Sequence, residues 1–388
     1  MDERCRVVFF HIGRDVIGGG SKMLLRLLTC IDRSRFDPVL VSQTDDELCK
    51  RAREEGVHVE IVPFRGTLDT YNRELLTTSP MTLFATGARI VQFNADVFSH
   101  FRRADVIWCK NLRAVLTLLP YVLGTRTPVI WNIGLGFESD GSLTYMNELA
   151  LWAVDHVFIE SDDQAQAVFT EGQYQRYRDE FTTFHKGIDL ERFDPDSIEP
   201  TIDVGDGLCV GTAASLTPRK GLEYLVEAIP RVLEDHDDVT FFIAGEAPEG
   251  HEKYARELRR RVEGLGVGDS VRFLGWVEDM PGYLAGLDVF VLSSLNEGIP
   301  GAVREALAME VPVVATDVGG TSTVVVEGET GTLVSPRSSE EIARGISDLL
   351  SDPAGRMERG QRGRDLIATE FSMEGYVDRY EDFILTMM

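Results

Sequence analysis

Short runs of apolar residues alternate along this chain with segments in which apolar residues recur at helical spacing. Runs of four or five apolar residues are typical of strands buried in a parallel sheet, and the helical segments between them are typical of the covering helices. This alternation predicts β-α-β units. In the first half it predicts strands at 7–10, 38–41, 57–62, 105–108, 128–131 and 156–159, and helices at about 21–31 and 46–55.

The alternation stops between residues 191 and 207, where Asp, Pro and Gly gather, and then resumes. Such a stretch is typical of a domain boundary, and 388 residues are enough for two hydrophobic cores. We predict an α/β protein of two Rossmann-like, doubly wound domains that face a cleft. The predicted parts are an N-terminal domain over 1–195, a second domain over 205–370, and a terminal helix within 371–388. The strands predicted in the second domain are 208–211, 239–244, 271–274, 289–292 and 311–315.

The stretch from Phe64 to Arg103 is less regular and mixes phenylalanines with arginines. An ordinary pair of packed helices is the favoured interpretation, and a mobile region that faces an acceptor or touches a membrane is the alternative. No apolar run approaches the length of a membrane span, and the N-terminus lacks the features of a signal peptide. We therefore predict a cytoplasmic protein, with at most a weak peripheral contact at the inner face of the membrane.

The chain is strongly acidic, with 64 Asp and Glu against 39 Lys and Arg and a formal net charge of -25. This charge argues against nucleic acid or an anionic lipid surface as the main partner. The acids are spread over the whole chain, which fits a halophilic protein whose self-repulsion is screened by salt; an ordinary acidic cytosolic enzyme is the alternative. The five cysteines are scattered without close pairs, which predicts free thiols.

Two carboxylates, Glu297 and Glu305, flank seven residues that include Gly298, Pro300 and Gly301. The segment follows a predicted buried strand and opens a predicted helix. Proline suits the first helical turn, and the free N–H groups of that turn bind hydroxyls or phosphate oxygens. Glu297 in the loop and Glu305 inside the helix are then able to reach different parts of one ligand. A surface loop with a solvated glutamate is the alternative interpretation.

Two further segments follow predicted strands and open predicted helices. In the first, Arg219 and Lys220 lie at the N-terminus of a predicted helix, where the two cations and the free N–H groups of the helix together bind an anion. This arrangement favours a nucleotide diphosphate as the ligand. In the second, Gly18 and Gly19 lie in a turn whose glycines allow a ligand to approach the backbone closely. The glycines alone are a weak signal, and no acid follows the second strand as a dinucleotide fingerprint requires.

The segment 293–308 resembles the nucleotide-sugar signature of the retaining glycosyltransferases of family 4, also called glycosyl transferases group 1, and the likeness extends over nearly the whole chain. The resemblance implies the two-domain fold called GT-B, in which the terminal helix crosses back onto the first domain. It also implies that Glu297 faces the donor sugar and that Glu305 binds the ribose hydroxyls. The donor-binding loop implied in the same way comprises Gly298, Ile299, Pro300, Gly301 and Ala302.

The resemblance places Lys220 at the diphosphate, with Arg219 as a second charge and with Gly18 and Gly19 near the diphosphate and the acceptor. Ser215 occupies the position of the arginine in the family motif. Many members carry an active-site histidine where this chain has Gly134. The residues that would compensate are Asn132, Glu138 or His185.

The implied reaction is transfer of a sugar from a nucleoside diphosphate sugar to an acceptor hydroxyl with retention, in the assembly of polysaccharides, glycolipids or glycoprotein glycans. Lys220, Arg219 and helix N-termini would stabilise the charge on the departing diphosphate, so that neither a metal nor another cofactor is expected. Two alternatives remain. One is an epimerase or phosphorylase on the same scaffold. The other is a catalytically silent partner that binds a sugar nucleotide, which Ser215 and Gly134 make credible. The sequence does not identify the sugar, the base or the acceptor.

Overall fold

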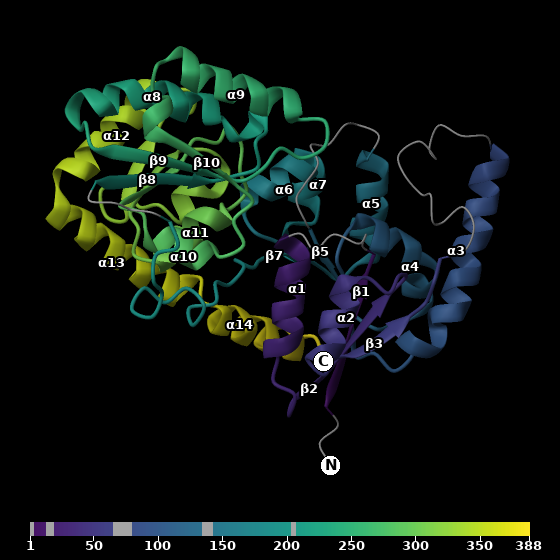
Figure 1. Cartoon of the computed structure of the whole chain (residues 1–388). Coiled ribbons are helices and arrows are strands. Elements are labelled where there is room, and N and C mark those ends of the chain that lie inside the picture. The colour runs from purple at the N-terminus through teal and green to yellow at the C-terminus, as the bar shows by residue number, and fades with distance from the viewer. Residues whose placement is uncertain (1–3, 13–18, 65–79, 134–142, 203–206) are drawn as a thin grey trace. The chain divides into compact units, whose positions relative to one another are not determined.

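The computed structural model describes residues 4–12, 19–64, 80–133, 143–202 and 207–388 (Figure 1). The chain forms two compact units. The first comprises the chain up to Phe184 together with Tyr376–Met388, and the second comprises His185–Gly375. Residues 185–195, which the sequence pattern assigns to the N-terminal domain, therefore belong to the second unit.

The described residues of the first unit contain a sheet of seven parallel strands in the order β3-β2-β1-β4-β5-β6-β7. The order reverses between β1 and β4, as in doubly wound folds. The strands are β1 (Cys5–His11), β2 (Phe36–Ser42), β3 (His58–Ile61), β4 (Val106–Cys109), β5 (Val129–Asn132), β6 (His156–Ile159) and β7 (Phe181–Thr183). The helices between them are α1 (Gly19–Cys30), α2 (Glu47–Glu54), α3 (Pro80–Phe101), α4 (Leu112–Gly124), α5 (Thr144–Ala153), α6 (Asp162–Val168) and α7 (Glu171–Arg176).

Helices cover both faces of this sheet, which is why its central strands are continuous apolar runs rather than alternating ones. On one face Phe10 packs against Phe93 and Phe101 of α3, with ring centroids 5.9 and 5.8 Å apart. On the other face Phe9 packs against Trp108. Side chains from α3, α4 and α5 join the same hydrophobic cluster as Phe10.

The described part of the irregular stretch after Phe64 contains one long helix, α3, of the pair that the sequence favours. Residues 65–79 lie outside the described part of the chain. Within α3, Phe93, Val97 and Phe101 are buried, whereas Phe98 is 56% exposed. The packed-helix interpretation thus holds for residues 85–101, as a single helix.

The last helix, α14 (Met373–Thr386), packs in the first unit from Tyr376 onward. Tyr380 is fully buried, with its ring 6.1 Å from that of Phe9 and 6.0 Å from that of Phe158. Next to it, the buried Glu381 accepts a hydrogen bond of 2.6 Å from the backbone N–H of Asp32. These contacts bind the C-terminal residues to a sheet that was formed by the N-terminal half of the chain.

The second unit contains a sheet of six parallel strands in the order β10-β9-β8-β11-β12-β13, the order of the Rossmann fold. The strands are β8 (Leu208–Ala213), β9 (Val239–Ala244), β10 (Val271–Gly275), β11 (Val289–Leu292), β12 (Val313–Thr316) and β13 (Gly331–Val334). The helices are α8 (Leu222–Asp235), α9 (Glu252–Gly264), α10 (Met280–Ala285), α11 (Gly301–Ala308), α12 (Ser339–Ser351) and α13 (Pro353–Glu370).

The predicted fold class is confirmed, since both units are doubly wound parallel sheets with helices on their faces. Two strands, β7 and β13, were not predicted from the sequence. Each lies at the edge of its sheet and is only partly buried. All five cysteines are free, and four of them are buried. No helix in the described ranges is long and apolar enough to cross a bilayer.

A buried pair of a histidine and an aspartate lies in the first unit, where β1 ends. His11 Nε2 is 3.3 Å from Asp46 Oδ2, and the two side chains are 2% and 3% exposed. Burial lowers the pKa of His11 below its usual value, because the hydrogen bond to Asp46 only partly offsets desolvation. Burial would raise the pKa of Asp46, but its hydrogen bonds with His11 and with the N–H of Cys49 lower it overall.

We expect the first unit to lose stability as the pH falls from 7.5 to 5.5. The pKa of His11 is lower in the folded chain than in the unfolded chain, so the unfolded chain binds more protons in this range. With an unfolded-state pKa of about 6.5, this loss is at most about 1.4 kcal/mol at pH 5.5. Denaturant unfolding of the wild type and of His11→Gln at both pH values measures it.

The expected result is a less stable variant whose stability changes less with pH. His251→Gln, at a half-exposed site in the second unit, is the control and should keep the pH dependence of the wild type. Equal pH dependence in His11→Gln and in the wild type would contradict the assignment.

Candidate active site

The loop between β11 and α11, residues 293–300, carries Glu297. All four residues of β11 are buried, so the strand fixes where this loop begins. Pro300 occupies the N-cap of α11, and no side chain caps the helix there. The helix itself begins at Gly301. The first N–H groups of α11 have no carbonyl partner within the helix, as at every helix start.

Backbone hydrogen bonds hold this loop against two other segments. Leu295 N–H donates to Arg219 O over 2.8 Å, and Gly320 N–H donates to Gly298 O over 2.9 Å. The hydroxyl of Thr316, in β12, donates to the carbonyl oxygen of Ser294 over 2.6 Å. The loop is thus fixed between the segment that precedes α8 and the segment that follows β12.

Two glycines with positive φ allow these close approaches. A Cβ atom at Gly319, where φ is 52°, would lie 1.9 Å from the carbonyl oxygen of Glu297. A Cβ atom at Gly221, where φ is 57°, would lie 2.2 Å from the carbonyl oxygen of Ser293. Both distances are too short for any side chain, so each position requires glycine.

Glu297, Lys220 and Arg219 form one charged cluster. Lys220 Nζ is 2.5 Å from Glu297 Oε1, and Arg219 Nη1 is 3.5 Å from Glu297 Oε2. The Ser294 hydroxyl donates to the same Oε1 over 2.6 Å. Glu297 is 9% exposed and Lys220 is 16% exposed, whereas Arg219 is 45% exposed. One buried carboxylate therefore faces two cations, with a net charge of about +1 that is available to an anion.

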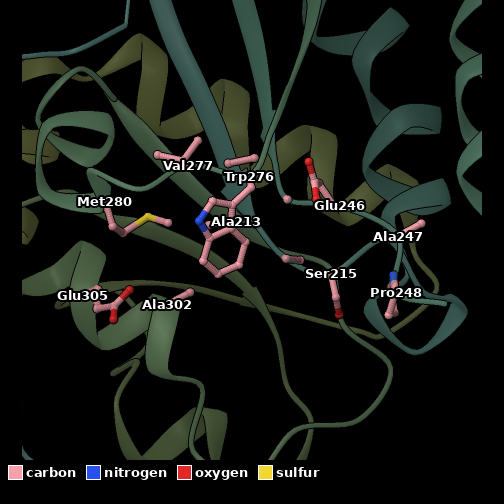
Figure 2. A pocket seen from close by; sticks show the side chains of 13 residues that line it. Ala213, Ser215, Glu246, Ala247, Pro248, Trp276, Val277, Met280, Ala302 and Glu305 are labelled. Carbon is pink, nitrogen blue, oxygen red and sulfur yellow. The ribbon is translucent and has the colours of Figure 1, made fainter. Parts of the chain in front are cut away.

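A pocket of about 450 Å³ opens beside this cluster (Figure 2). Glu305 and Ala302 of α11 line one side of it, and Ser215 lines the other. The indole of Trp276 lies between them in the view of Figure 2. The rest of the lining is Ala213, Ala214, Ala244, Gly245, Glu246, Ala247, Pro248, Val277 and Met280. The volume falls in the range of small-molecule sites, and the lining is mostly apolar with a few polar groups, as such sites are.

The pocket lies at the carboxyl ends of β8, β9 and β10, because the residues that line it follow those strands directly. Ligands of open α/β sheets bind at this edge. The pocket and the charged cluster share two supporting segments. One runs from Ser215 to Lys220, and the other leads from Glu297 into α11. The pocket and the charged cluster are therefore connected through both segments.

The structure brings together most of the residues predicted from the sequence. Glu297, Lys220 and Arg219 are in direct contact, while Glu305, Ser215 and Ala302 line the adjoining pocket. The rest of the predicted donor-binding loop connects the cluster to α11. In that loop Ile299 is 5% exposed, so its side chain belongs to the core.

The remaining predicted residues belong to the first unit, to the start of the second unit, or to the part of the chain that is not described. Gly19 is the first residue of α1 in the first unit, and Gly18 lies outside the described residues, as do Gly134 and Glu138. Asn132 ends β5 in the first unit. His185, in the second unit, stacks on Phe371 with ring centroids 5.0 Å apart.

Of the residues that line the pocket, only Ser215, Ala302 and Glu305 were predicted from the sequence; Trp276, Glu246 and Met280 are among those that were missed. A sequence signal was present for Trp276, which comes two residues after the strand predicted at 271–274. In the structure it is 68% exposed despite its size. The described residues contain no group of three or more His, Cys, Asp or Glu side chains that could hold a metal ion.

Comparison with known proteins identifies the second unit. Residues 207–352 match the family model of glycosyl transferases group 1. The second unit therefore carries a glycosyl transferases group 1 domain. The matched range contains the pocket, the charged cluster and the loop before α11, so the geometry described above is that of the family domain.

Two curated relatives illustrate the match. A lipopolysaccharide core biosynthesis mannosyltransferase of Rhizobium leguminosarum is 31% identical over 198 residues, which are 50% of this chain and 56% of the relative. A GDP-mannose-dependent phosphatidylinositol monomannoside mannosyltransferase of Mycobacterium tuberculosis is 29% identical over 212 residues, 51% of this chain and 54% of the relative. The chain spans about half the length of the curated relatives it matches.

Solved structures resemble the whole chain. The Anabaena protein HepE, in complex with UDP, aligns with a TM-score of 0.79 at 19% identity, over 98% of this chain and all of HepE. The sucrose-phosphate synthase of Thermosynechococcus elongatus aligns with a TM-score of 0.75 at 18% identity, over 99% of each chain. At such identities the likeness shows the fold, which is the GT-B fold expected from the sequence.

We expect Gly319→Ala to destabilise the second unit by about 2 kcal/mol or more. The left-handed backbone alone costs alanine about 1 kcal/mol, and the contact with Glu297 O adds to this cost. The matched control is Gly328→Ala, because φ there is 74° but no atom lies within 4 Å of the added Cβ. Denaturant unfolding of the two variants separates the clash from backbone strain, and equal losses would contradict the close approach.

Proposed function

We propose that this protein is a retaining hexosyltransferase that moves a sugar from a nucleoside diphosphate sugar to an acceptor hydroxyl. The group 1 domain supports transfer from a sugar nucleotide. The two relatives described above act in lipopolysaccharide and phosphatidylinositol mannoside synthesis, which favours a glycan or a lipid-linked sugar as the acceptor. Retention rests on the resemblance to family 4.

The observation that carries this proposal is the charged cluster beside the pocket. In the proposed complex the nucleoside fills the pocket, with Trp276 against the base and Glu305 accepting hydrogen bonds from the ribose hydroxyls. The diphosphate then lies toward Lys220 and Arg219. The sugar faces the loop before α11, where the backbone from Gly298 to Gly301 is available to its hydroxyls.

The chemical step breaks the bond between the anomeric carbon and the diphosphate oxygen. Negative charge grows on the departing diphosphate while the sugar approaches an oxocarbenium ion. Lys220 and Arg219 stabilise that negative charge, and they are already held in place by Glu297. The acceptor oxygen bonds to the anomeric carbon on the face that the diphosphate leaves, and the acceptor proton passes to the departing diphosphate. In this scheme no metal ion is needed to stabilise the leaving group.

Glu297 has two roles in the proposed cycle. Without donor it neutralises part of the charge on Lys220, which keeps a nearly buried ammonium paired. With donor bound, the diphosphate takes over as the partner of Lys220, and the carboxylate is released toward the positively charged sugar. The ion pair is thus exchanged rather than lost.

An epimerase or phosphorylase on the same scaffold is the weaker alternative, because no observation on the described residues favours it over transfer. A catalytically silent sugar-nucleotide-binding partner is favoured by one feature. Ser215 lines the pocket where the family motif carries an arginine, so one cation is missing. Arg219, on the same segment, supplies a second positive charge beside Lys220.

We expect saturable binding of at least one sugar nucleotide in a calorimetric screen of UDP, GDP and ADP sugars, followed by transfer assays. The screen is run in high salt, because the net charge of -25 repels anionic donors, and with a chelator to test metal independence. Lys220→Met should lower turnover by about 10²-fold or more by removing leaving-group stabilisation.

Lys253→Met, at an exposed lysine of α9, is the matched control and should behave as the wild type. If no sugar nucleotide binds, the transferase proposal fails. If a donor binds without any turnover on the acceptors tried or in water, the silent partner is favoured.

We expect Glu297→Gln to bind a free nucleoside diphosphate about tenfold more tightly and to turn over donor about 10²-fold more slowly. With glutamine at position 297, Lys220 and Arg219 lose the carboxylate that neutralises part of their charge, so they attract a bound anion more strongly. It also removes the negative charge that faces the sugar. Calorimetry and initial rates measure the two effects separately.

Glu305→Gln is the comparison variant, because it removes one negative charge from the pocket side instead. It should weaken nucleoside diphosphate binding, since a ribose acceptor is lost. Tighter binding in both variants would show that only the net charge of the site matters, and unchanged turnover in Glu297→Gln would count against the assignment of Glu297.

A further inference from the structure

Large apolar side chains are exposed unevenly over the described part of the chain. Twelve of them are exposed, and six of these twelve lie on α3, α4 and α5 of the first unit. The six are Val91, Phe98, Leu123, Tyr145, Leu149 and Trp152. Single exposed apolar residues are normal, but a gathering of this kind on neighbouring elements marks an interaction surface.

Helix α5 carries the clearest part of this surface. Tyr145, Leu149 and Trp152 are 84%, 40% and 63% exposed. They are spaced by four and three residues, so they lie on one side of the helix. The opposite side of α5 is buried in the core through Ala150 and Leu151. The helix is therefore apolar on both sides, although only one side is covered by protein.

The same surface extends over two neighbouring helices. Helix α4 contacts both α3 and α5 and lies between them (Figure 1). Phe98 of α3 contacts Tyr121 of α4, with ring centroids 5.9 Å apart, and is 56% exposed. Leu123 in the last turn of α4 is 54% exposed. We call the outer side of α3, α4 and α5 the three-helix face.

The charge of this region is opposite to that of the chain. The described residues of this region, 85–133 and 143–153, contain six Lys and Arg against three Asp and Glu, while the whole chain contains 39 against 64. Arg102 and Arg103 follow the end of α3, and Arg126 follows the end of α4; all three are exposed. Phe98 and Leu123 lie in the last turns of the same two helices, so exposed apolar and basic side chains lie close together at these helix ends.

We propose that the three-helix face docks onto the surface of a membrane that contains anionic lipid. Amphipathic surfaces with Trp, Tyr, Phe and Leu enter the boundary between head groups and acyl chains. Arginines beside them are attracted by anionic head groups, against the repulsion of the acidic remainder of the chain. The proposal does not rest on the proposed transferase activity, because docking requires neither donor nor acceptor.

Charge favours a membrane over a second copy of the chain as the occupant. A second copy would bring the same arginines against each other in a symmetric dimer. The other surfaces of a second copy are acidic. Among the described residues they carry no comparable apolar area, because the six remaining exposed apolar side chains are scattered over other elements. An anionic bilayer supplies both the negative charge and the apolar interior.

The test is flotation of the full chain with phosphatidylcholine vesicles, with and without added phosphatidylglycerol. We expect binding to the anionic vesicles that is weakened by salt. Trp152→Ser should lower the bound fraction by removing an apolar anchor. The double variant Arg102→Glu, Arg103→Glu should lower the partition coefficient about tenfold or more.

Two control variants carry matched changes in the second unit. Met357→Ser removes a side chain that is 63% exposed on α13, and Arg256→Glu with Arg260→Glu reverses two exposed charges on the basic helix α9. Both should bind as the wild type does. Circular dichroism shows that each variant is folded before it is compared.

Binding that is equal for all variants, or absent for the wild type on anionic vesicles, overturns the proposal. Sedimentation without vesicles tests whether a second copy of the chain is the occupant. If the wild type is a dimer, Trp152→Ser is a monomer and neither binds vesicles, the three-helix face mediates self-association. That result also overturns the proposal. Donor binding is measured separately, so failure of docking is distinguishable from failure of the transferase.

Discussion

The contact between Lys220 and Glu297 depends on backbone segments that lie closer together than side chains would permit. The loop before α11 is bonded to Arg219 O on one side and contacts Gly319 on the other. Gly221 and Gly319 make both approaches possible. With the backbone fixed in this way, the carboxylate of Glu297 has little freedom, and the ammonium of Lys220 meets it at 2.5 Å. Such positioning before a ligand arrives is what electrostatic catalysis requires.

The sheet order explains why these distant segments meet. Lys220 lies between β8 and α8, and Glu297 lies between β11 and α11. These strands are neighbours in the sheet although 77 residues separate the two side chains. The order of strands reverses at this pair, so the two following loops diverge and leave room above the sheet edge. The charged cluster and the pocket lie at this edge because of the topology of the sheet.

The sequence predicted those parts of the fold that depend on continuous local patterns. Buried strands such as β8 and β11 are apolar runs, and they were located correctly. The edge strand β7 was missed because its sequence is Phe-Thr-Thr, which has no apolar run. Glu297 and Glu305 were predicted as site residues from one motif with a fixed spacing, and Lys220 from a second. Trp276 was missed because the pocket is formed by residues at the ends of three strands. These residues are far apart in the sequence, so no local pattern predicts that they meet.

The direct contact between Lys220 and Glu297 was not predictable either, since it depends on the pairing of β8 with β11. It changes the interpretation of the site. In a chain of charge -25, an anionic donor is repelled at long range, and only short contacts favour it. Salt screens the repulsion beyond about 8 to 10 Å but leaves contacts of about 3 Å largely intact. A partly neutralised pair of cations therefore suits an acidic protein. In the proposed function, Lys220 stays paired with Glu297 until the diphosphate of the donor replaces the carboxylate at short range.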